Sequence, residues 1–142
     1  MVVEPTVEVL AAAIDCSTPK ALCDSVHKLT HENPSPLIRE AIIRALQIAD
    51  KSITMQDKAG RTAVHLACWL GYTACTQVLL DAAQGINVET LQELLLMESS
   101  YYSFIPLHWA CCFGRIDCAR VLLAAAKRIG DNMVKMLLFK KD

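Results

Sequence analysis

The sequence predicts an all-α fold, a helical solenoid of about three units with an extra helix in the connections between units. Two observations carry this prediction. Residue types recur at an offset of 43 positions, so that His65 matches His108 and Gly71 matches Gly114. Apolar residues within each copy are spaced three and four apart, which indicates short amphipathic helices. We expect one domain over residues 1–142, with units at about 5–50, 51–97 and 98–142.

Composition supports one folded domain and argues against several classes of protein. The chain is 54% hydrophobic and 20% charged, which is enough apolar material for a core. Its longest apolar runs have six residues, far fewer than the roughly 20 that span a bilayer. The N-terminus does not resemble a signal peptide, and the odd count of seven cysteines favours reduced thiols. We therefore expect an intracellular protein, cytoplasmic and/or nuclear, with no membrane span.

The middle unit shows the pattern of three helices in order. Apolar positions over 62–70 and 74–84 predict two short antiparallel helices joined by a tight turn at Gly71. Val88, Leu91 and Leu94 then share one face of a third helix. The last unit repeats this pattern around Gly114, with 129–139 as its third helix.

The first unit is more divergent. Apolar residues over 37–50 again have helical spacing, and the preceding Asn-Pro-Ser-Pro at 33–36 breaks the chain before them. Cys23 and Val26 keep the spacing of Cys75 and Val78. This correspondence predicts that a helix at about 18–31 is the second helix of its unit.

The stretch from Thr62 to Gly71 reads TAVHLACWLG, and the stretch from Ile105 reads IPLHWA. Both resemble the ankyrin repeat, whose motif is a finger turn followed by Thr-Pro-Leu-His-x-Ala. The resemblance covers about residues 50–142 well, and residues 5–50 only by helix pattern. It implies structural roles in helix starts, turns and hydrogen bonding to the finger backbone. The residues with these implied roles are Thr62, His65, Gly71, Pro106, His108 and Gly114.

Three positions depart from the family's motif. Ala63 stands in place of proline, and Ile105 stands in place of the threonine that caps the first helix. Ser103 replaces the finger-turn glycine that Gly60 supplies in the previous copy, so we expect that turn to be strained or differently shaped.

Two alternatives accompany this interpretation. The 43-residue period exceeds the 33 residues usual for ankyrin repeats, and HEAT or armadillo repeats have about 40–47 residues with two or three helices. The chain also fits a cytosolic ankyrin segment of a larger receptor or channel. Every one of these solenoids offers an extended surface suited to gripping another protein.

The resemblance also implies where a partner binds. In ankyrin repeats the recognition positions are the finger tips and the two residues before the turn glycine. Here these positions are Lys58, Ala59, Arg61, Trp69, Leu70, Tyr101, Tyr102, Phe104, Cys112 and Phe113. We expect one contiguous aromatic patch, with Trp109 packed between helices instead. In the alternative arrangement, the third helix buries these rings as core. We predict a protein–protein interaction module, a scaffold or adaptor, without cofactor or small-molecule substrate.

Catalytic and metal chemistry is weakly supported. His65, Cys68 and Cys75 have spacing that suggests zinc ligands, but the paired Cys-x2-Cys knuckle of structural zinc sites is absent, so we expect no metal. We expect Cys68, Cys75, Cys111 and Cys118 to be buried and inert, and Cys112 to be the thiol most open to alkylation. No paired acid and base or oriented triad is apparent, so we expect no catalytic site and no enzyme.

Two expectations concern the C-terminal region. Its basic residues do not form a recognition motif, so nucleic-acid binding is not favoured. These residues are Arg115, Arg120, Lys127, Arg128, Lys135, Lys140 and Lys141. Residues 133–139 are apolar over a broad arc where a solenoid would carry a polar cap. We expect this uncapped edge to self-associate, or the chain to belong to a longer parent.

Overall fold

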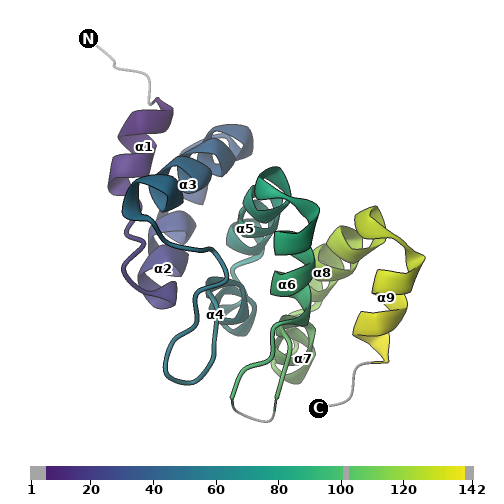
Figure 1. The fold of residues 1–142 in the computed structure, drawn as a ribbon. Coiled ribbons are helices and arrows are strands. Elements are labelled where there is room, and N and C mark those ends of the chain that lie inside the picture. Colours follow the sequence, from purple (N-terminus) through teal and green to yellow (C-terminus); the bar gives the residue numbers. More distant parts are fainter. Residues whose placement is uncertain (1–5, 101–102, 140–142) are drawn as a thin grey trace.

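The computed structural model describes residues 6–100 and 103–139, and every regular element within them is an α-helix (Figure 1). The predicted all-α solenoid is confirmed. The helices are α1 (Val7–Ala13), α2 (Pro19–Thr30), α3 (Ser35–Ala49), α4 (Ala63–Leu70), α5 (Thr73–Ile86), α6 (Val88–Leu96), α7 (Pro106–Cys112), α8 (Ile116–Ile129) and α9 (Asp131–Leu138).

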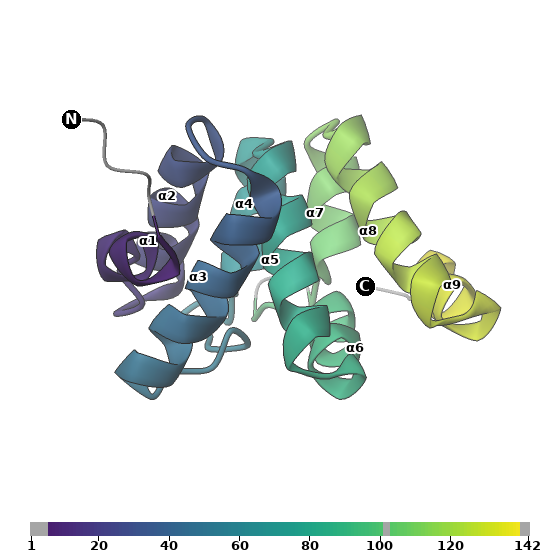
Figure 2. The same ribbon diagram turned by 90° about the horizontal axis from the view of Figure 1, so that it is seen from above.

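The helices form two stacked rows. One row runs α2, α4, α7, and the other runs α3, α5, α8, with each helix packed against the next in its row (Figures 1 and 2). Helix α1 packs against α3 at one end of the stack, and α9 packs against α8 at the other. None of the helices in the described part of the chain is long and apolar enough to cross a membrane.

The extra helix predicted between units is present as α6. It starts at Asn87, whose backbone is extended and whose side-chain Oδ1 accepts a hydrogen bond from the amide of Thr90 at 2.7 Å. Leu91, Leu94 and Leu95 bury the inner face of α6 against the solenoid. Because burying one leucine contributes roughly 1.5–3 kcal/mol, α6 belongs to the folded core.

A helix is present near the predicted range 18–31, but its predicted role as the second helix of its unit is wrong. Helix α2 lies in the row of α4 and α7, so it is the first helix of its pair, and α3 is the second. The Cys75 thiol donates a hydrogen bond to the carbonyl of Cys23 at 3.5 Å, so these cysteines face each other across a unit boundary. Apolar spacing of three residues occurs in both rows, and so it could not identify the row.

Glycines end the first helices of the two later units. Gly71 terminates α4 with φ of 78°, and Gly114 follows α7 with φ of 69°. Both values lie in the left-handed region, which side chains disfavour. The predicted turn roles of these two glycines therefore agree with the backbone geometry.

Candidate functional site

The first finger, residues 57–61, is built around Asp57. Its carboxylate accepts hydrogen bonds from the amides of Ala59 and Arg61, both at 2.9 Å, and forms a partly buried ion pair with the Arg61 guanidinium at 2.9 Å. Gly60 completes the turn with φ of 74°. This network fixes Arg61 at the base of the finger, with Lys58 exposed at its tip.

The second finger lies beside the first. The Ser100 amide donates to the Ala59 carbonyl at 2.7 Å, and a Cβ on Gly60 would lie 2.7 Å from the same Ser100 nitrogen. Ser103 adopts φ of 53°, so the strained turn expected there is confirmed. Phe104 is half-buried next to the ring of His108, at a centroid distance of 5.2 Å. Tyr101 and Tyr102 of the predicted patch lie outside the described residues.

His65 connects one unit to the finger of the next. Its Nδ1 accepts from the Thr62 amide at 3.0 Å, and the Thr62 hydroxyl accepts from the His65 amide at 3.3 Å. This pattern assigns the proton to Nε2, which donates to the carbonyl of Phe104 at 3.1 Å. Burial lowers the pKa of His65 to about 4, so the ring is neutral at pH 7. This geometry matches the structural role that the resemblance implies.

The second copy of the motif differs from the first. Ile105 provides no side-chain cap for α7, as expected from the missing threonine. The Ile105 amide still donates to Nδ1 of His108 at 3.1 Å, as the Thr62 amide does to His65. Pro106 occupies the first position of the helix, where a missing amide hydrogen costs nothing.

Three rings form what we call the aromatic cluster: Trp69, Trp109 and Phe113. The Trp69 ring centroid lies 5.7 Å from that of Trp109 and 6.1 Å from that of Phe113, and the Trp109 and Phe113 rings stack at 5.8 Å. Trp109 is only 8% exposed and donates from Nε1 to the Ser99 hydroxyl at 3.3 Å. As predicted, Trp69 neighbours Phe113, and Trp109 packs between helices.

The aromatic cluster is accessible at two of its rings. Phe113 is 46% exposed and Trp69 is half-buried, so α6 does not enclose them as the alternative arrangement required. The Arg61 guanidinium lies 5.8 Å from the centre of the Trp69 ring, within range of a cation–π interaction. Leu70 is half-buried beside this group and Cys112 is exposed. Arg61, Trp69 and Phe113 therefore form one surface from two successive units.

Arg115, one of the basic residues of the C-terminal region, also belongs to this surface. Its Nε donates to the carbonyl of Trp69 at 3.1 Å, and its side chain lies over Gly71, where a Cβ would approach it to 3.1 Å. At the 43-residue offset Arg115 matches Tyr72, which likewise reaches back and stacks on His27 of the preceding unit. The position after each turn glycine thus contacts the previous unit. No signal in the sequence predicts this contact, because it depends on the conformation of the side chain.

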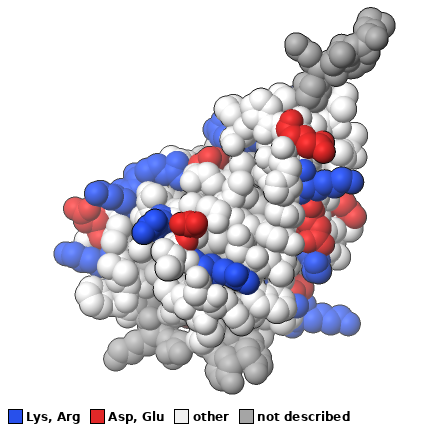
Figure 3. Space-filling view, turned by 180° about the vertical axis from the view of Figure 1, so that it is seen from behind, with Lys and Arg blue, Asp and Glu red and all other residues white. Residues whose placement is uncertain are grey.

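The remaining basic side chains do not form a continuous positive surface. Arg120 pairs with Asp117 at 3.7 Å, and Arg128 pairs with Asp81 at 3.3 Å. On the face shown in Figure 3, basic and acidic residues are interspersed. Lys140 and Lys141 lie outside the described residues. The charge distribution gives no support to a nucleic-acid interface.

The neighbouring thiols of Cys68 and Cys118 do not form an accessible reactive site. A hydrogen bond with Cys68, helped by the hydroxyls of Thr73 and Thr76, lowers the pKa of Cys118 to about 6, while the same bond and burial raise the pKa of Cys68. Cys118 is nonetheless only 1% exposed. In the described part of the chain no group of three or more His, Cys, Asp or Glu residues has the geometry of a metal site.

The expectation that Cys111 is buried is wrong. Cys111 and Cys112 are both exposed, whereas Cys68, Cys75 and Cys118 are buried as expected. Cys68, the equivalent of Cys111, is covered by Cys118 from the following unit. No described helix pair follows α9 to cover Cys111 in the same way.

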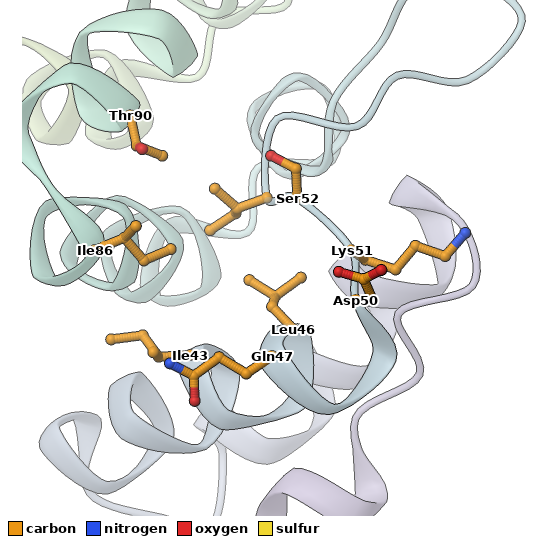
Figure 4. A pocket seen from close by; sticks show the side chains of 9 residues that line it. Ile43, Leu46, Gln47, Asp50, Lys51, Ser52, Ile86 and Thr90 are labelled. Carbon is orange, nitrogen blue, oxygen red and sulfur yellow. The ribbon is translucent and has the colours of Figure 1, made fainter.

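A pocket of about 290 Å³ lies away from the aromatic cluster, between the end of α3 and the start of α6 (Figure 4). Apolar and polar side chains line it together. They are Ile43, Leu46, Gln47, Asp50, Lys51, Ser52, Ile53, Ile86 and Thr90. Its single carboxylate has no second acid or histidine beside it in the lining, so the pocket shows no arrangement for acid–base catalysis.

The family model described as ankyrin repeats, in three copies, matches residues 33–133. No curated protein and no solved structure matches the chain significantly. The match covers most of the sequence and favours the ankyrin interpretation over the HEAT or armadillo alternative. The chain therefore belongs to the ankyrin-repeat family.

Proposed function

We propose that the chain is a protein-binding module, a scaffold or adaptor rather than an enzyme, that holds its partner on the aromatic cluster and the adjoining fingers. Ankyrin repeats are generally protein–protein interaction modules, which supports the general role. The proposed binding residues are those at the recognition positions. They are Lys58, Ala59, Arg61, Trp69, Leu70, Tyr101, Tyr102, Phe104, Cys112 and Phe113.

The observation that carries this proposal is the pair of solvent-accessible rings of Trp69, which is half-buried, and Phe113, which is exposed. They come from successive units, and their centroids are 6.1 Å apart. Trp109 packs against both from the buried side. Rings held in place before binding lose little conformational freedom on binding, and Trp and Tyr are enriched among the residues that dominate binding energy.

Arg61 adds a polar contact at the edge of these rings. Its ion pair with Asp57 and its position over Trp69 fix the guanidinium before any partner arrives. A fixed guanidinium can form paired hydrogen bonds with a carboxylate or with backbone carbonyls. We infer a partner segment with an apolar side chain for the rings and an acidic or carbonyl group for Arg61.

The test uses Phe113→Ala and Trp69→Ala, with Ile48→Ala as the control. Ile48 is 75% exposed on α3, so its substitution removes a comparable exposed apolar side chain elsewhere. Partners would be captured from cell lysate on the parent chain, identified by mass spectrometry, and their affinities measured with each variant. Each ring substitution should weaken binding by about thirtyfold, which corresponds to about 2 kcal/mol.

Thermal melting distinguishes an interface from a core role. Phe113→Ala should melt close to the parent because 46% of Phe113 is already exposed to solvent in the folded chain. Retained affinity in both ring variants would contradict the proposed site. If Trp69→Ala and Phe113→Ala both melt far below the parent, the rings are core instead.

We also propose that the module works in the cytoplasm and/or nucleus. All seven cysteines are free in the structure, including the exposed Cys111 and Cys112. Exposed free thiols persist in reducing compartments and tend to oxidise elsewhere, which supports this placement.

A further inference from the structure

We propose that His27 and His31, neither of which is among the proposed partner-binding residues, form a surface site for a divalent transition-metal ion of the Zn²⁺ or Ni²⁺ class. The two residues lie on the last turn and at the C-terminal cap of α2. Residues four apart on a helix share one face. His27 is half-buried and His31 is exposed, so an ion in solution can reach both rings.

The separation of the two ring nitrogens fits a shared ion. The Nε2 atoms of His27 and His31 lie 3.4 Å apart. Two imidazole nitrogens bound to one tetrahedral Zn²⁺, each at 2.0–2.1 Å, are about 3.3–3.4 Å apart. The spacing of the two Nε2 atoms therefore already equals that of two histidines that share one ion.

Tyr72 holds one of the two ligands in position. Its ring stacks on His27 with a centroid distance of 3.5 Å and an interplanar angle of 7°. Stacking uses the face of the imidazole and leaves Nε2 at the edge available for a metal. The His31 ring stands at 81° to that of His27. A ligand already fixed by a neighbour loses less freedom on coordination, as in metal sites where outer groups orient the histidines.

The ordinary alternative is a hydrogen bond between two neutral imidazoles. Its 3.4 Å length exceeds the usual 2.7–3.2 Å for hydrogen bonds donated by N–H, so such a bond would be weak and easily displaced. The C-terminal end of a helix carries partial negative charge, which favours a bound cation there. Both conditions favour a metal ion over the bare pair.

The ligand set determines the class of ion. Imidazole suits Zn²⁺, Ni²⁺ and Cu²⁺, whereas Mg²⁺ and Ca²⁺ require oxygen ligands. Asp24 lies one turn earlier on α2, but its carboxylate pairs with Lys20 at 2.9 Å. We therefore assign two protein ligands, with water in the remaining positions.

The test is a calorimetric titration of the full chain with NiCl₂ at pH 7.5, where an ordinary imidazole is mostly neutral. The unaltered chain is titrated first, and Cys111→Ser and Cys112→Ser are then introduced together, since thiolates also bind such ions. The chain with both cysteine substitutions is the parent for the variants that follow. His27→Gln and His31→Gln each remove one ligand. Lys28→Gln is the control, because Lys28 lies between the two histidines in sequence and is not a ligand. Thermal melts without metal check that all variants fold.

We expect one Ni²⁺ per chain. Either histidine variant should lose about a hundredfold in affinity, because two linked ligands bind an ion much more tightly than one ligand does. Lys28→Gln should bind as the parent does. Tyr72→Leu should weaken binding by less than the loss of a ligand, which would identify Tyr72 as a positioning residue.

Two results would overturn the site. One is an affinity within about threefold of the parent in either histidine variant. The other is loss of all Ni²⁺ binding on substitution of the two cysteines alone, which would assign the binding to thiols. Imidazole ¹⁵N resonances of His27 and His31 should move on titration while those of His65 stay fixed, and the opposite pattern would also contradict the proposal.

Discussion

At the scale of single residues, His65 joins backbone segments that are far apart in the sequence. Its two ring nitrogens and its amide satisfy Thr62 on one side and Phe104 on the other, 39 positions later. Since the side chain is 0% exposed, any charge on it would be buried, and the effect of burial on its pKa exceeds that of the Asp57 carboxylate. His65 is therefore stabilising only while neutral, which gives a prediction about pH.

The free energy of unfolding should fall in acid because of His65. The folded pKa is about 4 and the unfolded value is 6.5, so between these values the unfolded chain binds a proton that the folded chain does not. The contribution of His65 is present above pH 6.5 and is lost as the pH falls toward 4, by roughly 3 kcal/mol in total. Urea unfolding of the parent and of His65→Gln at several pH values between 7.5 and 4.5 measures it. Carboxylates titrate equally in both proteins, so equal pH dependence in the two would disprove the assignment.

Ser103 should be a site where glycine stabilises the protein. A side chain at φ of 53° lowers the free energy of unfolding by roughly 1–2 kcal/mol. A glycine would remove this strain, but its greater freedom in the unfolded chain would cancel about half of the gain. Ser103→Gly should therefore raise the free energy of unfolding by about 0.5–1 kcal/mol. Gly60→Ala is the matched reverse change and should destabilise, because its Cβ would lie 2.7 Å from the Ser100 amide nitrogen. Chemical denaturation of both variants checks the signs, and a destabilised Ser103→Gly would show that the serine side chain contributes more than its strain costs.

At the scale of elements, the sequence predicted helices well where the apolar periodicity and the residues that start or end helices agreed. Helices α4, α5 and α6 lie within a few residues of their predicted ranges, because Gly71 and the leucine spacing after Asn87 mark their ends. The prediction that α2 is the second helix of its unit was wrong, because apolar spacing does not say which neighbour a helix packs against. The aromatic neighbours Trp69 and Phe113 followed from the family's geometry, whereas the reach of Arg115 to the Trp69 carbonyl depends on a side-chain conformation that no motif encodes.

Helix α6 should depend on its cap. Asn87 ends α5 and also starts α6, and its Oδ1 accepts from both the amide and the hydroxyl of Thr90. Asn87→Ala should lower the free energy of unfolding by about 0.5–2 kcal/mol, since it leaves first-turn amides without an acceptor. Asn87→Asp keeps the acceptor and is the control. Denaturant melts of the two variants give the comparison, and an unchanged Asn87→Ala would mean that water satisfies the end of α6.

At the scale of the whole molecule, the two ends of the stack are not alike. Helix α1 covers α3 at one end, while α9 at the other buries only its inner face, with Met133 and Leu137 against the solenoid. Part of the apolar arc expected over 133–139 is thus buried against the solenoid, and part of it is exposed. Leu138 and Phe139 remain 56% and 76% exposed. An exposed apolar edge of this kind marks an association surface or an aggregation hazard.

We expect this edge to drive self-association of the isolated chain. Light scattering after size-exclusion chromatography should show a mass that rises with protein concentration, because association removes Leu138 and Phe139 from water. The double change Leu138→Glu and Phe139→Lys should restore a monomer at every concentration, while Ile48→Glu, at an equally exposed position on α3, should not. Phe113→Ala separates this edge from the aromatic cluster, since it should leave self-association intact. A parent chain that stays monomeric at the highest concentration would contradict the proposed edge, and association abolished by Phe113→Ala instead would move the contact to the aromatic cluster.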